Sequence, residues 1–547
     1  MKFIRLVWEA AGERRLKLIL SLMASTFGLL GVLVVISFVL DPETGSDGTA
    51  TPDLFGLLLF ALVAFGVIGG NAVGQRLSAA IVEDLLDRIR RDYADLVRRS
   101  DYGRFESFGP NRVYDTLTRN SQMLTEAAIM AIHGVSAFGA LVLAGFYTLL
   151  VSPLVFAVIA TLIVLTAFFY RLTQRQVHES LTASSERQGI FYALFRHLID
   201  GFKEVKLNHP RGDSLEHSHL APESGMLRNA QVEAAIQINR GISVSYLFFY
   251  TTLAMIAFVL PPFVGDQAVI VQSVYVAVFM LSVVEVILKA VPVITRANFA
   301  IDELDTVERF LRDALRPEAA PEDGETFERI DIEDLRYSYY DPDGARSFTM
   351  GPTSLHIQRG EMLFLVGGNG SGKSTLVKAL TRLYEPESGM IYRDRVPVDE
   401  SNVADYRALF SGVFSDFHLF DRLYGLEHVP EADVNALLGE LGIAHKTQYR
   451  EGVFTNTNLS TGQRKRLALA VALLENRPIL VLDELAADQD PEFRQRFYNE
   501  LLPKWKREGR TLVIVSHEDQ YFHVADRTLV LVDGQARERT ADGEETR

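Results

Sequence analysis

The N-terminal part of the chain alternates between long apolar stretches and long charged ones. Six apolar stretches approach the roughly 20 residues that a helix needs to cross the hydrocarbon core of a bilayer. The third and fourth stretches are together too long for one span and meet at Ser152 and Pro153, so we expect a hairpin with a tight turn there. The six predicted spans are Leu16–Leu40, Asp53–Leu77, Ala127–Val151, Pro153–Tyr170, Gly241–Pro261 and Ala268–Val291.

The residues before the first span have the pattern of an amphipathic helix. Within Met1–Gly12, the apolar side chains Phe3, Val7 and Trp8 are interspersed with charged ones. Tryptophan is enriched at the boundary between membrane and water. This segment is therefore predicted to be an interfacial helix that lies in the membrane surface.

The distribution of basic residues orients the spans, because cytoplasmic connections carry an excess of Lys and Arg. The residues before the first span, residues 88–119 and the stretch after the fourth span are rich in Lys and Arg. The connections Asp41–Pro52 and Pro262–Gln267 hold acidic residues but no Lys or Arg. We therefore expect a multi-pass membrane protein with both termini in the cytoplasm.

From Phe327 onward the pattern changes to short apolar strands that alternate with helices, which is typical of an α/β domain. The preceding segment Arg316–Gly324 places two prolines among acidic residues and has the composition of a linker. We predict an α-helical six-span transmembrane domain over residues 1–315, a linker over residues 316–326 and an α/β P-loop domain over residues 327–547.

The composition agrees with a membrane part followed by an acidic, water-soluble part. The chain is 48% hydrophobic with a mean hydropathy of +0.10, yet its formal net charge is −15. That negative charge argues against nucleic acid as the main partner. The chain has no cysteine, which excludes disulfides, thiolate metal sites and cysteine nucleophiles.

The strongest chemical signal is a glycine-rich loop between a predicted strand and a predicted helix. Residues 367–375 read Gly-Gly-Asn-Gly-Ser-Gly-Lys-Ser-Thr and match the motif G-x-x-x-x-G-K-[ST]. Backbone N–H groups of such a loop close around phosphate oxygens at a helix N-terminus. Lys373 is expected to neutralise charge on the β- and γ-phosphates, and the Ser374 hydroxyl to bind Mg²⁺. The predicted nucleotide-binding residues of this loop are Gly367, Asn369, Gly370, Ser371, Gly372, Lys373, Ser374 and Thr375.

A pair of carboxylates follows a second apolar strand. The run Ile479–Leu482 ends in Asp483 and Glu484. Asp483 suits the coordination shell of Mg²⁺, and Glu484 suits a base that polarises the attacking water. A carboxylate pair at a strand end is common by itself, but with the phosphate-binding loop it predicts an enzyme that uses ATP and Mg²⁺.

Together with three further motifs, these elements resemble the ATPase domain of ABC transporters. The segment Leu459–Gln463 reads Leu-Ser-Thr-Gly-Gln and is similar to the family's signature, usually LSGGQ. Asp490 matches the D-loop aspartate, and His517 matches the switch histidine. The resemblance covers the whole C-terminal domain and implies that Glu484 and His517 are the catalytic residues.

The resemblance also implies that two ATPase domains sandwich two ATP molecules, with the signature of one domain on the γ-phosphate held by the other. Because this chain has one such domain, a homodimer is the simplest way to complete the sites. Tyr339 resembles the aromatic residue that stacks on adenine, with Tyr337 and Tyr340 as competitors and a structural aromatic as an equal alternative. The resemblance adds to the nucleotide site Ser460, Thr461, Gly462, Gln463 and Asp490.

One position departs from the family's pattern. Where the family usually has a Q-loop glutamine, the segment Phe410–Phe420 places Ser415. A serine hydroxyl is shorter and reaches Mg²⁺ only through water or a movement of the backbone, and Asp416 is the alternative metal ligand. The departure puts the usual account of coupling between the membrane part and the ATP site in doubt, though not ATP binding itself.

Several segments resemble the branch of the family that exports cyclic peptides, including exporters of siderophores such as pyoverdine precursors, of lipopeptides such as syringomycin, and of the lasso peptide microcin J25. We therefore expect an ATP-driven half-transporter that exports a cyclic or modified peptide. Two alternatives stay open: a broad lipid or multidrug exporter of the same fold, and an ATP-gated membrane sensor that does not transport. The segments that carry this resemblance are Leu198–Asn208, Ser415–Phe420, Leu459–Arg466, Ala486–Pro491 and Ser516–Phe522.

Four residues of the membrane part are candidates for contact with cargo. Glu285 and Lys289 lie four residues apart in the sixth span and share a helix face. Because charge is costly inside a bilayer, the two either line a water-filled cavity or form a mutual ion pair near the cytoplasmic end. Tyr246 and Tyr250 in the fifth span either line a cavity or belong to an ordinary packing stripe.

Two cytoplasmic segments are expected to dock on an ATPase domain, as the family resemblance implies. Asp200–Leu207 is predicted to contain a short transverse helix. The second docking segment is expected near Phe105–Tyr114.

Overall fold

The computed structural model describes residues 2–20, 22–24, 26, 31, 54–316, 326–340 and 345–539. The chain divides into two compact units. The helical unit comprises Met1–Asp92 and Tyr114–Val307, and the α/β unit comprises Tyr93–Val113 and Glu308–Arg547. The middle of the connection between the second and third predicted spans, Tyr93–Val113, thus belongs to the same unit as the C-terminal part of the chain.

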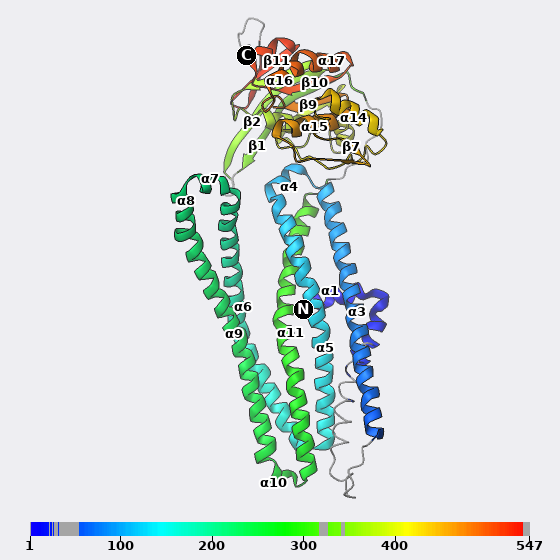
Figure 1. The fold of residues 1–547 in the computed structure, drawn as a ribbon, viewed down its shortest axis with the longest axis vertical. Coiled ribbons are helices and arrows are strands. Elements are labelled where there is room, and N and C mark those ends of the chain that lie inside the picture. The colour runs from blue at the N-terminus through cyan, green and yellow to red at the C-terminus, as the bar shows by residue number, and fades with distance from the viewer. Residues whose placement is uncertain are drawn as a thin grey trace. The chain divides into compact units, whose positions relative to one another are not determined.

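Long helices build the helical unit (Figure 1). They are α3 (Leu54–Arg99), α5 (Pro110–Val151), α6 (Pro153–Asp200), α9 (Ala221–Ala254) and α11 (Gln267–Asp313). The shorter helices of this unit are α1 (Lys2–Ala11), η1 (Gly12–Arg14), α7 (Phe202–Leu207), α8 (His209–Asp213), η3 (Ser214–Leu220), η4 (Met255–Val259) and α10 (Pro261–Val264), whereas α4 (Tyr102–Phe108) belongs to the α/β unit. The helix predicted within Met1–Gly12 and the short one within Asp200–Leu207 are therefore confirmed as helices.

Five of the predicted spans fall on described helices, and the first, Leu16–Leu40, lies largely outside the described residues. Among the described residues, four helical segments are long and apolar enough to cross a membrane. The fourth predicted span is the shorter apolar segment Pro153–Phe169 at the start of α6. The four longer segments are Leu54–Arg99, Pro110–Val151, His209–Val259 and Gln267–Asp313.

The predicted hairpin between the third and fourth spans is the junction of α5 and α6. Ser152 is the N-cap of α6, and its hydroxyl accepts a hydrogen bond from the Val155 N–H at 3.4 Å. Pro153 begins the helix, where no intrahelical N–H is required and its fixed φ is already helical. α6 and α9 pack along each other (Figure 1), and Ala144 of α5 and Met280 of α11 belong to one buried cluster.

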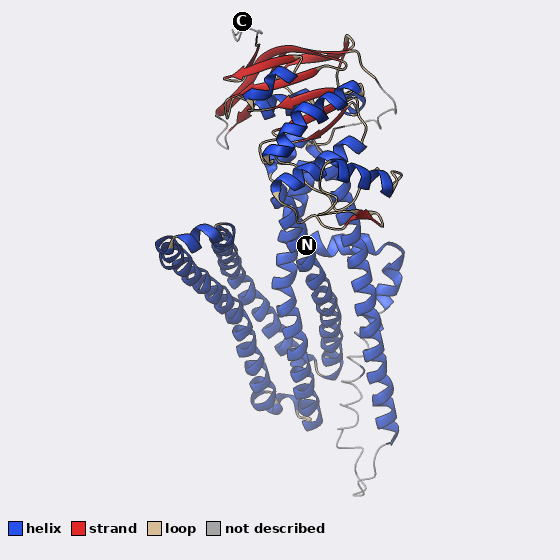
Figure 2. Cartoon of the chain, turned by 45° about the horizontal axis from the view of Figure 1, so that its top comes forward, coloured by secondary structure: helices blue, strands red, loops and turns tan. Residues whose placement is uncertain are grey.

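Every described strand lies in the α/β unit (Figure 2). The main sheet has six strands in the order β12-β11-β3-β10-β9-β6, parallel except for β12. An antiparallel sheet has the order β2-β1-β4-β5, and β7 pairs with β8. The strands are β1 (Arg329–Tyr340), β2 (Arg346–Gln358), β3 (Met362–Gly367), β4 (Ser388–Arg393), β5 (Val396–Pro397), β6 (Phe410–Val413), β7 (Tyr449–Arg450), β8 (Val453–Phe454), β9 (Ile479–Asp483), β10 (Thr511–Val515), β11 (Arg527–Val532) and β12 (Gln535–Glu538).

Helices cover the main sheet, and the central strands β9 and β10 are buried along their whole length. Apolar side chains therefore occupy successive positions in these strands, as is usual for a parallel sheet covered on both faces. The parallel order brings the C-terminal ends of β3, β9 and β10 to one edge, which is where ligands bind in open α/β sheets. The helices are α12 (Lys373–Leu380), α13 (Val403–Arg407), α14 (Glu431–Glu440), α15 (Thr461–Leu474), α16 (Pro491–Arg496), η5 (Phe497–Leu501), α17 (Leu502–Arg507) and η6 (Asp519–Val524).

Candidate functional site

The glycine-rich loop joins β3 to α12 at the edge where the parallel strands end. Gly367 has a φ of +150°, and a Cβ there would lie 2.4 Å from the backbone oxygen of Leu531, so only glycine fits. Gly372, with a φ of +99°, precedes the first helical residue, Lys373. Gly368, Asn369, Gly370 and Ser371 thus form a turn at a helix N-terminus, the geometry that binds phosphate through backbone N–H groups.

Lys373 lies folded against this loop. Its ammonium group donates to the backbone oxygens of Gly367 at 3.1 Å and Gly368 at 2.9 Å. Burial lowers the pKa of Lys373, and the negative charges of Glu484 and Asp483 oppose that shift. The side chain is therefore a buried cation held at the loop, close to two carboxylates.

Asp483 has the properties expected of a metal ligand. It is 1% exposed, and neither carboxylate oxygen accepts a hydrogen bond of good geometry from the described residues. Burial raises the pKa of Asp483, against a smaller lowering by the nearby hydroxyls of Ser374 and Ser415. A divalent cation beside Asp483 and Ser374 would satisfy this buried carboxylate, so the residues present fit the predicted Mg²⁺ site.

The structure distinguishes between Ser415 and Asp416, the two candidates to replace the Q-loop glutamine. β6 and β9 are parallel partners, with Val413 opposite Leu482, so Ser415, which follows β6, lies at the same sheet edge as Asp483 at the end of β9. Asp416 instead forms an ion pair with Lys378, with 2.9 Å between Oδ2 and Nζ. Ser415 is therefore the residue placed at the predicted metal site.

Glu484 and His517 are brought into contact by neighbouring strands. β9 and β10 are parallel partners, with Asp483 opposite Val515, so the residues that follow them meet. His517 Nε2 lies 3.1 Å from Glu484 Oε1. The Glu484 backbone is fixed on both sides, because its N–H donates to the Val515 oxygen at 3.1 Å and its oxygen accepts from Lys465 Nζ at 2.8 Å.

The predicted signature segment forms the N-terminus of α15. Ser460 and Gln463 form a capping box, in which each side chain accepts a hydrogen bond from the other residue's backbone N–H. Thr461 is the first helical residue, and a Cβ at Gly462 would lie 2.5 Å from the Asp488 backbone oxygen. Within the described ranges, no hydrogen bond or ion pair joins this segment to the glycine-rich loop of the same chain.

Asp490 is the N-cap of α16 and accepts a hydrogen bond from the Phe493 N–H at 2.8 Å. It also forms an ion pair with Arg466 of α15. The preceding residue, Gln489, donates to the Gly462 backbone oxygen at 3.0 Å. The D-loop candidate is thus tied to the signature helix.

The three tyrosines proposed near the adenine site differ in their surroundings. Tyr339 is half-buried, and its hydroxyl lies 3.3 Å from Thr375 Oγ1 in the first turn of α12. Tyr337 stacks on Tyr384 at 4.4 Å between ring centroids, and burial raises the pKa of Tyr337 to about 12. Tyr340 is 55% exposed and donates to Glu387. Of the three, only Tyr339 is bonded to the helix that begins at the loop.

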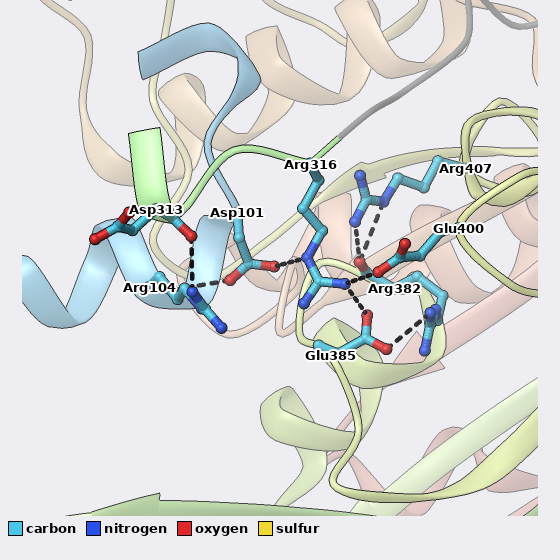
Figure 3. A network of polar contacts seen from close by, with 8 residues as sticks. All are labelled: Asp101, Arg104, Asp313, Arg316, Arg382, Glu385, Glu400 and Arg407. Carbon is cyan, nitrogen blue, oxygen red and sulfur yellow. Dashed lines mark hydrogen bonds and ion pairs between the residues drawn. The ribbon is translucent and has the colours of Figure 1, made fainter. Parts of the chain in front are cut away.

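The second predicted docking segment, near Phe105–Tyr114, overlaps the short helix α4, which packs within the α/β unit. Its N-cap, Asp101, accepts a hydrogen bond from the Arg104 N–H at 3.0 Å. Arg316 lies between three carboxylates (Figure 3), 3.4 Å from Asp101, 3.4 Å from Glu385 and 3.3 Å from Glu400. Sequence reasoning missed these residues, although Gly109 and Pro110 mark the break that separates α4 from α5.

Three of the four candidates for cargo contact form one cluster. Lys289 and Glu285 are ion-paired on α11, and Tyr246 of α9 is within hydrogen-bonding reach of Glu285. A separate apolar pocket of about 260 Å³ lies within the helical unit, between α5, α6, α9 and α11. None of the four candidates lines this pocket, whereas Ser245 and Phe249, which are neighbours of Tyr246 and Tyr250 in sequence, do.

Several known proteins are similar to this chain. Residues 350–487 match the family model described as ABC transporter. The chain is 34% identical over 437 residues to the ATP-binding protein SyrD of Pseudomonas syringae pv. syringae, which covers 76% of this chain and 75% of that one. It is 28% identical over 451 residues to an ATP-dependent lipid A-core flippase of Ralstonia nicotianae, covering 78% of this chain and 73% of that one.

A solved structure has the same fold over nearly the whole chain. It is a bacterial Atm1-family ABC exporter with ATP bound, and it matches with a TM-score of 0.77 at 17% identity. The match covers 96% of this chain and 94% of the other.

Proposed function

Since this chain belongs to the ABC transporter family and couples ATP hydrolysis to transport across a membrane, we propose that it is a homodimeric exporter of a cyclic or modified peptide in the bacterial inner membrane. The observation that best supports ATP hydrolysis is the contact between Glu484 and His517 beside the buried Asp483. Both side chains lie at the strand edge that also holds the glycine-rich loop.

In the proposed reaction, the loop and Lys373 hold the β- and γ-phosphates of ATP. Lys373 exchanges its contacts with two backbone oxygens for contacts with phosphate oxygens. Asp483 and Ser374 would hold Mg²⁺, which neutralises charge that develops on the phosphates. Glu484 orients the attacking water and accepts its proton, and His517 keeps the carboxylate in position.

The proposal of a homodimer rests on the separation of the signature from the loop within one chain. Ser460, Gly462 and Asp490 lie at helix N-termini, where backbone N–H groups favour an anionic ligand. A second copy would present these residues to the phosphate held by the first.

We also propose the division of the chain into domains. A transmembrane domain comprises residues 1–315, and a linker joins it to an ATPase domain over residues 327–547.

The proposal of a peptide cargo rests on the segments that resemble the cyclic-peptide branch, and the relative SyrD supports it at 34% identity over three quarters of both chains. The charged and phenolic cluster of Tyr246, Glu285 and Lys289 supplies donors and acceptors that suit peptide groups. A cargo with several amide groups would satisfy such polar side chains better than a hydrocarbon would.

The test is ATPase activity of the protein in lipid nanodiscs, titrated with cyclic peptides, linear peptides of the same sequence, and lipids. Saturable stimulation by cyclic peptides alone would support the proposal. Absence of ATP turnover under every condition, in a protein that still binds ATP, would contradict it. The Glu484→Gln variant gives the background rate.

Export of a lipid is the second candidate, favoured by the pocket between α5, α6, α9 and α11. Apart from Thr166, Ser245 and Thr252, its lining is apolar, which suits an acyl chain. Relatives described as lipid A-core flippases also match, one of them at 28% identity over 451 residues. Stimulation of the ATPase by lipid, together with loss of that response when Ala277 is replaced by Trp to fill the pocket, would favour this candidate.

A further inference from the structure

Polar contacts join α4 to the rest of the α/β unit and lead back to the nucleotide site by two routes. The first route begins at Thr375, in the first turn of α12. Its hydroxyl lies 3.3 Å from the Tyr339 hydroxyl, which in turn donates to the Tyr384 hydroxyl at 3.2 Å. Tyr384 donates to Glu106 of α4 at 2.7 Å. Three hydroxyl groups thus connect the helix of the phosphate loop to a carboxylate of α4.

The second route begins at the predicted metal ligand. Ser415 lies beside Asp483, and the next residue, Asp416, pairs with Lys378 at 2.9 Å. Lys378 Nζ also lies 3.5 Å from Glu106 and 3.3 Å from the Tyr102 hydroxyl, and both of these residues belong to α4. Because the Lys378 side chain is only 11% exposed, these partners stabilise its positive charge in place of water.

Both routes end on Glu106, whose two carboxylate oxygens face Tyr384 and Lys378 respectively. Lys378 also lies over the rings of Tyr102 at 5.3 Å and Tyr384 at 5.4 Å, which adds cation–π attraction. A buried cation that loses one partner is strongly destabilised. The cluster therefore responds when the segment that carries Ser415 and Asp416 moves, or when Tyr339 turns to meet a base.

We propose that Glu106 and Lys378 are positioning residues that convey ATP binding to α4, and that they take over the coupling role left open by serine at position 415. α4 connects α3 to α5, so a shift of α4 acts directly on two membrane-spanning helices. The inference rests on the proposed function, because it requires a homodimer that changes conformation when ATP binds. It assigns to two side chains outside the nucleotide site a part in the response to ATP.

The experiment uses the absence of cysteine to label one position cleanly. Phe263 in α10 is 73% exposed, and a Phe263→Cys spin label in each copy reports the distance between copies at that end of the membrane helices. The parent is Phe263→Cys with Glu484→Gln, so that ATP binds without turnover. Tyr384→Phe, Glu106→Gln and their combination are added to this parent, and ATP binding is measured separately by equilibrium titration.

The matched control is Tyr406→Phe. Tyr406 is also buried, and its hydroxyl donates at 2.9 Å to the Leu380 backbone oxygen rather than to α4. In the parent and the control, saturating ATP is expected to shift the distance to the same extent. Tyr384→Phe and Glu106→Gln are expected to bind ATP within about two-fold of the parent, yet to lower the ratio of shifted to unshifted molecules at least about five-fold, the lower range of allosteric coupling.

The double variant separates a shared link from two independent defects. Because Tyr384 acts on α4 through its bond to Glu106, the double variant is expected to be no worse than the more severe single variant. Losses that multiply, or a loss of ATP binding that parallels the loss of the shift, would overturn the inference. The same measurement on Asp416→Asn tests the second route, and a shift equal to that of the parent would remove that route.

Failure of the inference can be told from failure of the proposed function. If the parent binds ATP but its distance never changes, the proposed ATP-driven homodimer fails and the inference with it. If the parent responds and Tyr384→Phe and Glu106→Gln respond equally, only the inference fails. Both substitutions are nearly isosteric, so either one alone decides the question if the other does not fold.

Discussion

At the nucleotide site, opposite charges are buried close together. Lys373 is 5% exposed and Asp483 is 1% exposed, and the Lys373 ammonium group donates to two backbone oxygens of the loop. Buried charge without a full set of partners costs free energy. The fold thus keeps a locally unfavourable arrangement that ATP and a cation would relieve, as functional sites commonly do.

This arrangement predicts that Asp483→Asn stabilises the nucleotide-free protein while it abolishes Mg²⁺-dependent hydrolysis. Burial raises the pKa of Asp483, so the folded state binds its proton more tightly than the unfolded state does. The Asp483 carboxylate therefore destabilises the folded state most when the pH is well above its pKa in the folded state. The destabilisation disappears as the pH falls below the pKa of Asp483 in the unfolded chain. Thermal unfolding of both proteins between pH 4 and pH 8, without nucleotide, should show a difference that grows with pH.

A second prediction concerns Glu484. Glu484→Gln removes the base, and the loss of general-base catalysis is expected to lower kcat by about 10²- to 10⁴-fold, with ATP affinity retained. Glu492→Gln, at an exposed position in α16, is the control and should keep its activity. Steady-state ATPase assays with separate ATP titrations check both. A Glu484→Gln variant that kept more than a tenth of the activity would contradict the assigned role.

At this scale, the sequence predicts contiguous motifs well and distant contacts poorly. The glycine-rich loop was predictable because its function depends on neighbouring backbone groups. Glu484 and His517 are in contact because they follow two adjacent parallel strands. The order of the motifs along the chain also indicates that these two residues belong to one site. The pairing of Lys378 with Glu106, residues far apart in the chain, depends on how α4 packs, and no local pattern of the sequence encodes it.

At the scale of elements, α4 is a short helix that needs its ends fixed. Seven residues are too few to be stable alone, so caps and tertiary contacts decide whether the helix forms. Asp101 caps its start, and Gly109, with a φ of +93°, ends it before Pro110 begins α5. The docking segment predicted near Phe105–Tyr114 overlaps the second half of α4, and the helix begins at Tyr102 because Asp101 caps its N-terminus.

Asp101→Ala is therefore predicted to loosen α4. The substitution removes the N-cap, worth about 1 kcal/mol, and one of the three carboxylates around Arg316. We expect cleavage by trypsin at Arg104 to accelerate about five-fold, because that free energy raises the open population by this factor. Asp101→Asn keeps a capping oxygen and should be cleaved at nearly the wild-type rate. Equal acceleration in both variants would show that the ion pair, rather than the cap, holds the helix.

The lengths of the membrane helices show another limit of prediction. The apolar pattern marked Pro153–Tyr170 as a span, whereas α6 continues without a break to Asp200. Hydropathy locates the part of a helix that contacts lipid, but the charged continuation is set by helix propensity and by packing along α9. The position of a membrane span was thus easier to predict from the sequence than the full length of the helix that contains it.

At the scale of the whole molecule, the proposed homodimer makes a prediction about mixed dimers. Suppose that one chain carries Lys373→Ala and its partner carries Ser460→Arg. One ATP site then receives both defects, and the other site stays intact. If a single chain carries both substitutions and pairs with wild type, each site receives one defect.

Dimers purified through two different affinity tags allow this comparison. The arrangement with the substitutions on separate chains should retain ATPase activity, and the arrangement with both on one chain should lose it. Equal activities in the two arrangements would contradict sites shared between copies. Wild-type dimers carrying the same two tags provide the reference rate.

The unbroken length of α6 has a mechanical consequence. Its 48 residues extend about 72 Å at 1.5 Å per residue, whereas the hydrocarbon core of a bilayer is only about 30 Å thick. With the bilayer as fulcrum, a tilt of about 10° would sweep the tip of a 40 Å arm, the length left outside the core, through about 7 Å. The helix thus behaves as a lever, and the displacement of its tip per degree of tilt depends on bilayer thickness. A thicker membrane shortens the part of the helix outside the core, so the same displacement of the tip then requires a larger tilt.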